Sequence, residues 1–169
     1  MTVTSVEKDL NALTLTVTAD FAAPPDKVWE LWADPRKLEK WWGPPTYPAT
    51  FVQHDLTPGA VVTYYMTSPE GEKYYGWWKI NAVNPPTTIE FNDGFGDQDG
   101  NPVEGSPVGV VSVSFSATET GTRMTMLSRN STPEQFQQVL EMGLEEGLTV
   151  TVGQMDAILA EASLSSQTR

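Results

Sequence analysis

The sequence predicts an α+β domain in which a curved antiparallel sheet of six or seven strands surrounds one long C-terminal helix. Between residues 13 and 129, apolar and polar residues alternate in short segments that proline and glycine separate. From residue 132 onward, the apolar residues recur with a helical period instead. A chain of 169 residues suffices for one domain with a real core, so we expect residues 1–169 to form a single domain with its core at about 13–162.

One strand and two short helices are predicted first. Residues 13–21 alternate apolar side chains with threonine, alanine or aspartate, which is typical of a strand with one buried face. Pro24 and Pro25 favour a helix start, and Pro35 ends this helix. A second short helix is expected over residues 35–41, before Gly43 turns the chain.

Six further segments have strand character, and the short links between them predict an antiparallel meander. Pro-Gly, Glu-Gly, Pro-Pro and Thr-Gly pairs and one Gly/Asp-rich loop separate these segments. The segments are residues 47–56, 60–67, 73–83, 88–95, 108–118 and 122–129.

The end of the chain predicts one continuous helix that begins near Thr132. Residues 132–135, Thr-Pro-Glu-Gln, fit a capping box with proline at the first helical position, and apolar residues then repeat as far as Ala162. Gly143, Gly147 and Gly153 lie inside this helix, and each costs about 1 kcal/mol relative to alanine. Gly143 and Gly147 share a face, which either lets a strand approach closely or leaves volume for a ligand.

Composition and charge argue against several kinds of partner. The formal net charge is −12, so we expect neither nucleic acid nor a membrane as a partner. One histidine, no cysteine and no glycine-rich phosphate loop lead us to expect neither a metal nor a cofactor. The first eight residues have no basic leader and no apolar run, which with the lack of cysteine predicts a cytoplasmic location.

A series of short motifs gives the chain a family resemblance. In order they are Val28-Trp29, Asp34-Pro35, Leu38, Trp41-Trp42-Gly43-Pro44, Asp55-Leu56-Thr57-Pro58-Gly59 and Asn84-Pro85-Pro86. With these motifs the chain resembles, over nearly its whole length, the family of activator of heat-shock-protein-ninety ATPase homologues within the SRPBCC (START-like) superfamily. The resemblance implies a helix-grip fold and a link to stress response. It leaves the activity open, because the family includes ligand carriers, polyketide cyclase-like enzymes and co-chaperone domains.

The aromatic residues indicate a binding pocket. The chain has 6 Trp, 5 Tyr and 6 Phe, more large rings than a small core needs, and rings with a polar edge are typical of half-open pockets. Alternation sends neighbouring strand residues to opposite faces, and it does not show which ring of an adjacent pair faces the ligand. We expect a small, mostly apolar or aromatic ligand between the sheet and the C-terminal helix, in contact with Trp42, Tyr64, Trp77, Trp78, Phe91, Met126, Leu148 and Met155.

Two other functions stay open at this point. His54, the single histidine, is a candidate catalytic base for a cyclase or hydrolase if a carboxylate such as Asp55 or Glu90 meets it in one cavity. We expect His54 to share a strand face with Val52 and Leu56. Alternatively, the acidic C-terminal helix binds a basic protein partner as a co-chaperone does, or a second copy of the chain forms a homodimer.

Charged residues elsewhere are expected to be solvated. An acidic loop begins at Asp93, and its spacing does not fit a calcium-binding loop. Its members are Asp93, Asp97, Asp99, Asn101 and Glu104. Arg123 and Arg129 are interpreted as solvated charges on a strand face, with an internal pair to Glu90 as the alternative.

Overall fold

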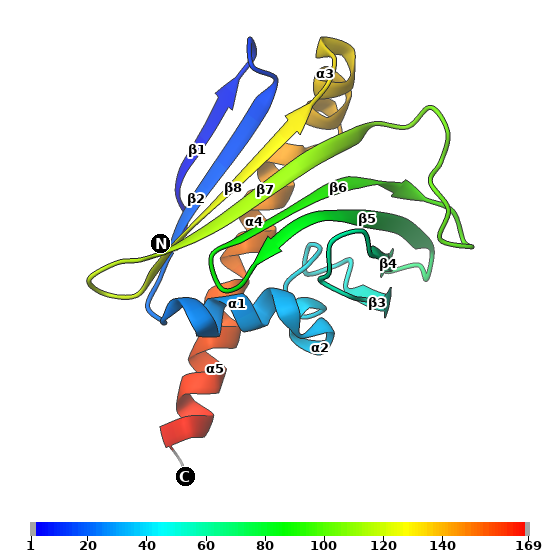
Figure 1. Ribbon diagram of the computed structural model, residues 1–169. Coiled ribbons are helices and arrows are strands. Elements are labelled where there is room, and N and C mark those ends of the chain that lie inside the picture. The colour runs from blue at the N-terminus through cyan, green and yellow to red at the C-terminus, as the bar shows by residue number, and fades with distance from the viewer. Residues whose placement is uncertain (1–2, 168–169) are drawn as a thin grey trace.

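Eight antiparallel strands form one curved sheet in the computed structural model, which describes residues 3–167 and side chains as far as residue 161 (Figure 1). Across the sheet the order is β1-β2-β8-β7-β6-β5-β4-β3. The strands are β1 Val3–Asp9, β2 Thr14–Phe21, β3 Ala49–Gln53, β4 Val61–Thr67, β5 Lys73–Asn84, β6 Thr88–Gly96, β7 Val108–Ala117 and β8 Thr122–Asn130. The predicted antiparallel α+β fold is therefore confirmed, with a larger sheet than expected. Met1, Thr2 and the side chain of Ala162 lie outside the described part.

The additional strand is β1, which forms one edge of the sheet. It pairs antiparallel with β2, but most of its side chains are exposed or half-buried. An edge strand can be held by backbone hydrogen bonds along one neighbour without a regular row of buried side chains. The alternation that reveals the other strands is accordingly weak in β1, so the sequence pattern does not predict this strand.

The helices follow the predicted order, with one correction. They are α1 Pro25–Ala33, α2 Pro35–Leu38, α3 Pro133–Glu141, α4 Leu144–Gly153 and α5 Met155–Gln167. Thr132 caps α3 by accepting a hydrogen bond from the backbone N–H of Gln135 at 3.1 Å, so the predicted helix start is confirmed.

The expectation of one continuous C-terminal helix is wrong. Gly143 has a φ of 90°, a left-handed conformation that glycine adopts without strain, and this residue separates α3 from α4. A second irregularity at Gln154 separates α4 from α5. Figure 1 shows the three helices following one another along one side of the sheet, with α5 continuing beyond it.

Aromatic rings fill the core beneath α1 and α2. Trp32 is fully buried, and its ring centroid lies 4.8 Å from that of Trp41 and 6.2 Å from that of Phe91. Trp29 is half-buried and packs edge-on against the buried ring of Phe115. This end of the interior is therefore densely packed, unlike the end below α3 and α4.

Candidate functional site

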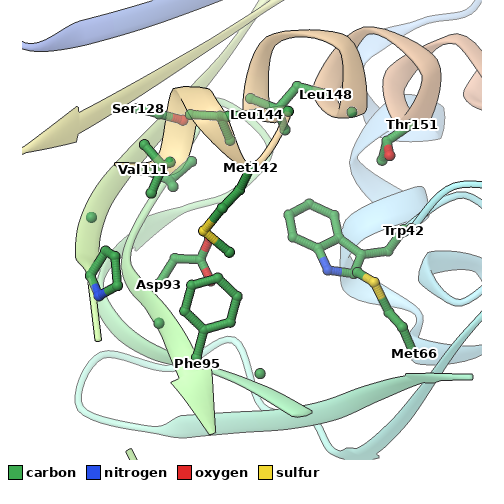
Figure 2. A pocket seen from close by; sticks show the side chains of 18 of the residues that line it. Trp42, Met66, Asp93, Phe95, Val111, Ser128, Met142, Leu144, Leu148 and Thr151 are labelled. Atoms are coloured by element: carbon green, nitrogen blue, oxygen red, sulfur yellow. The ribbon is translucent and has the colours of Figure 1, made fainter. Parts of the chain in front are cut away.

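A cavity of about 330 Å³ lies between the sheet and the junction of α3 with α4 (Figure 2). This volume is at the lower end of the range of about 300–1,000 Å³ that is typical of small-molecule sites. The wall is mostly apolar, and seven segments of the chain contribute to it. Its residues are Trp42, Gly43, Pro44, Tyr64, Met66, Tyr74, Tyr75, Gly76, Asp93, Gly94, Phe95, Pro107, Gly109, Val111, Met126, Ser128, Asn130, Val139, Met142, Gly143, Leu144, Gly147, Leu148 and Thr151.

Half of the residues expected to contact a ligand belong to this wall. They are Trp42, Tyr64, Met126 and Leu148. The other four, Trp77, Trp78, Phe91 and Met155, are not among the wall residues. Trp78, Phe91 and Met155 are buried completely, and Trp78 stacks on Phe91 with ring centroids 4.3 Å apart, so these rings belong to the packed core.

Trp77 and Trp78 lie on opposite faces of the sheet. Trp78 pairs across the strands with Asp93 on the inner face, whereas Trp77 pairs with Gly94 on the outer face. The Trp77 ring lies over Gly94, where a Cβ atom would collide with it, and its Nε1–H donates a hydrogen bond to the carbonyl of Phe95 at 2.9 Å. Trp77 therefore stabilises the back of the sheet.

The break at Gly143 leaves part of the helical wall without side chains. Gly143 and Gly147 both line the cavity, and a Cβ atom added to Gly147 would have no atom within 4 Å. Close approach of a strand therefore does not explain Gly147. The glycine instead leaves space on the pocket side of α4, which agrees with the second of the two explanations that the sequence left open.

Alanine substitutions separate helix stability from pocket volume. Gly147→Ala and Gly153→Ala should each raise the free energy of unfolding by about 0.4–1 kcal/mol in urea denaturation, because neither new methyl group meets another atom. Only Gly147 borders the cavity, so only its substitution should alter the binding of a pocket ligand. Loss of stability in Gly147→Ala would mean that α4 packs more closely on the sheet than described.

Asp93 is the one acidic or basic residue in the described wall of the cavity. It lies on the inner face of β6, and its cross-strand neighbours are Trp78 on β5 and Gly109 on β7. The Asp93 side chain is half-buried. Protein atoms surround its carboxylate on all sides except the side that borders the pocket. Burial raises the pKa of this carboxyl to about 7.

The expectation that Asp93 belongs to a solvated acidic segment is wrong. Only the later acidic residues of that segment lie in the loop, where Asp97 accepts hydrogen bonds from the backbone N–H groups of Asp99 and Asn101, both at 2.9 Å. Asp93 still follows the alternation of β6, which directs it to the same face as Phe91 and Phe95. Figure 2 shows Asp93 and Phe95 on one side of the pocket and Trp42 on the other.

Tyr64 places a hydroxyl in the same wall. Its ring is buried and occupies the space that the absent side chain of Gly76 leaves, where a Cβ atom would collide with it. Burial raises the pKa of the Tyr64 hydroxyl, and the negative charge of Asp93 raises it further. The hydroxyl is therefore a neutral hydrogen-bonding group at physiological pH.

Gln154 links the helices to the other side of the pocket. Its side-chain Nε2 donates hydrogen bonds to the carbonyl of Trp41 at 3.1 Å and to that of Gly43 at 2.7 Å. These bonds attach the junction of α4 and α5 to the turn that carries Trp42. The position of α4 over the sheet is thereby coupled to the aromatic side of the wall.

His54 does not line the pocket. It follows the end of β3, and its Nε2 lies 3.0 Å from the carbonyl oxygen of Trp32. Burial lowers its pKa. Val52, which was expected to share its buried face, is 70% exposed.

The carboxylates considered as partners of His54 also lie elsewhere. Asp55 accepts a hydrogen bond from the Thr57 hydroxyl at 2.6 Å, and Glu90 lies 3.4 Å from the hydroxyl of Ser112. Neither carboxylate lines the cavity. The structure therefore does not bring the residues of the suggested catalytic group together.

Arg123 pairs with Asp20 on the neighbouring strand. Its Nε and one terminal nitrogen donate to the two carboxylate oxygens at 2.9 and 3.1 Å, and both side chains are exposed. This surface pair replaces the internal pair with Glu90 that was considered. Within residues 3–161, no three His, Cys, Asp or Glu residues gather as metal ligands would.

The sheet, the helices along it and the pocket between them define the helix-grip class of proteins. The chain belongs to the family described as Activator of Hsp90 ATPase homolog 1-like protein, which matches residues 22–160, so the resemblance seen in the sequence is confirmed. Proteins of this family typically bind ligands or other proteins. None of the helices in the described part of the chain has the length and apolar character needed to span a membrane.

Solved structures support the same assignment. A crystal structure of a Mycobacterium smegmatis protein is 51% identical, with 93% of this chain and 96% of that chain covered and a TM-score of 0.86. A solution structure of an Arthrobacter aurescens protein is 46% identical, with 95% and 93% covered and a TM-score of 0.90. A Rhodobacter sphaeroides protein, 21% identical over 95% and 99% of the two chains with a TM-score of 0.81, shares the fold. No curated protein matches this chain.

Proposed function

We propose that the protein binds a small, mostly apolar or aromatic molecule in the pocket between the sheet and the α3–α4 junction. The observation that carries this proposal is an apolar-walled space of about 330 Å³ bordered by the helix break at Gly143 and by Gly147 of α4, neither of which has a side chain. Protein cores are ordinarily filled to the density of organic crystals. A cavity of this size next to Gly147, which lies inside α4 and weakens it, is better explained by a ligand than by packing.

The character of the wall agrees with a ligand of adaptable shape. Met66, Met126 and Met142 contribute thioether side chains, which are polarisable and adjust to irregular surfaces. Met142 is 58% exposed and Phe95 is 40% exposed, although both line the cavity. We infer that these two side chains border the opening through which a ligand enters.

Binding without chemistry is favoured over catalysis by the distribution of ionisable groups. A cyclase or hydrolase that uses His54 would need this ring in the cavity with a carboxylate beside it. His54 instead contacts the backbone of Trp32 outside the pocket. The cytoplasmic location, the role in stress response and the independence of metals and cofactors stay predictions that rest on composition and family.

A neutral fluorescent probe tests the proposal. N-phenyl-1-naphthylamine should bind the native protein with increased fluorescence, and Leu148→Trp should weaken this binding at least tenfold, because the larger ring occupies the cavity. Val150→Trp is the matched control, since Val150 lies on the same helix and is 47% exposed outside the wall. His54→Ala should also leave probe binding unchanged.

Two results would contradict binding in the pocket. If the probe does not bind, or binds Leu148→Trp and Val150→Trp equally well, the pocket is not the binding site. Circular dichroism of both variants establishes that each is folded. Interaction of the acidic helices with a protein partner, or with a second copy of the chain, would then be the better account.

A further inference from the structure

We propose that the pocket selects ligands that carry a protonated amine, and that the carboxylate of Asp93 pairs with this ammonium group. The inference rests on the proposed function, because it names the ligand class for the same pocket. It goes beyond apolar binding by assigning a charge and a position to the polar end of the ligand.

The carboxylate of Asp93 has no hydrogen-bond or ion-pair partner among the side chains that the structure describes. Within residues 3–161, no N–H or O–H group donates a hydrogen bond to its carboxylate, and no lysine, arginine or histidine forms an ion pair with it. The residue beside it on β7, Gly109, has no side chain that could approach. The carboxylate therefore borders the cavity with its acceptor positions unused.

A buried carboxylate without a partner is costly, and it either takes up a proton or finds a cation. The raised pKa of Asp93 reflects this cost, since burial is its sole cause. An ammonium group would supply both the opposite charge and up to three N–H donors, and such charge-assisted hydrogen bonds are among the strongest in proteins.

The charges around the pocket favour a cationic ligand over an anionic one. The remaining polar side chains of the wall, which include Ser128, Asn130 and Thr151, carry no charge that could hold an anion. The whole chain has a net charge of −12, and its potential attracts cations toward the pocket and repels carboxylates and phosphates. Trp42 and Phe95 lie in the same wall and suit the apolar body of an amine.

Three probes with the same ring system test the inference. These are 1-naphthylmethylamine, 1-naphthalenemethanol and 1-naphthoate, which are cationic, neutral and anionic at pH 8. Isothermal titration calorimetry at pH 8 should show the amine binding at least tenfold more tightly than the alcohol, with the carboxylate weakest. In Asp93→Asn, which keeps the shape of the side chain, the amine and the alcohol should differ by less than threefold.

A pH comparison adds a second readout. Amine affinity for the native protein should fall about tenfold from pH 8 to pH 6, because the proton competes with the ammonium for a carboxylate whose pKa is about 7. The alcohol should show no such fall. The other ionisable side chains of the described wall are the phenols of Tyr64, Tyr74 and Tyr75, and the pKa values of Tyr64 and Tyr74 are raised above the ordinary phenol value.

The outcomes separate this inference from the proposed function. Equal binding of the amine and the alcohol to the native protein would overturn the inference and leave the apolar pocket standing. An amine preference that persists in Asp93→Asn would also overturn it, because the acidic surface would then be responsible. If none of the three probes binds, both proposals fail.

Discussion

Asp93→Asn should stabilise the folded protein by about 2–4 kcal/mol at pH 8 and by little at pH 4. The carboxyl of Asp93 has a pKa of about 7 in the folded chain, against about 3.9 in an unfolded one. Between these values the folded state binds more protons, so native stability decreases as the pH rises from 4 to 7. If water were fully excluded from the carboxyl, the stabilisation by Asp93→Asn would be about 4 kcal/mol at pH 8. Because the carboxyl borders the pocket, water reaches it and lowers this stabilisation toward about 2 kcal/mol. Asparagine does not ionise, so the variant should not lose stability as the pH rises.

Urea denaturation at pH 4, 6 and 8 measures this effect. Asp20→Asn is the matched control, because Asp20 is a strand aspartate whose pKa is lowered by its hydrogen bonds with Arg123. It should therefore give no stabilisation at pH 8. Parallel pH profiles for the native protein and Asp93→Asn would show that Asp93 titrates as an ordinary carboxyl.

Asp93 lowers the stability of the fold, and an uncharged residue of the same shape could take its place. Its presence therefore indicates a functional role. Natural sequences accept such losses mainly where a site needs a strained or poorly solvated group. Asp93 and Gly147 each weaken the fold, and both border the same cavity. This coincidence of stability losses is independent of the family assignment and supports the same pocket.

The sheet and the helix start could be predicted because their signals are local. Alternation revealed seven strands, and residues 132–135 fixed the start of α3 through the cap at Thr132. The break at Gly143 could not be predicted in the same way. Apolar residues keep a helical period across it, and only the positive φ of Gly143 shows that the chain turns there.

The site was harder to predict because register and long-range pairing determine it. Trp77 and Trp78 are equivalent in an alternating pattern, and their pairing with Gly94 and Asp93 decides which one faces inward. His54 does not share a face with Val52 as expected, because the register of β3 with β4 shifts between Phe51 and Gln53.

The residues around Asp93 contain a signal for its inward position. It falls two residues after Phe91 and two before Phe95, inside a predicted strand with alternating burial. A lone acid at an inward position of such a strand differs physically from the acids of the loop that follows. Grouping it with Asp97 and Asp99 by composition concealed this difference.

Trp78→Ala should lower the free energy of unfolding by about 3–5 kcal/mol, a large part of the stability of a typical domain. Trp78 is fully buried, stacks on Phe91 and meets the edge of Trp42 with ring centroids 4.9 Å apart, so its removal leaves a cavity lined by other rings. Trp78→Phe should cost less than about 2 kcal/mol, because it keeps an aromatic ring and removes an indole N–H that has no hydrogen-bond partner. Urea denaturation followed by circular dichroism compares the two variants. A loss below about 1.5 kcal/mol for Trp78→Ala would mean that the neighbouring rings rearrange to fill the space and do not form a rigidly packed core. Trp42 would then lack the rigid support that a ligand-binding wall needs.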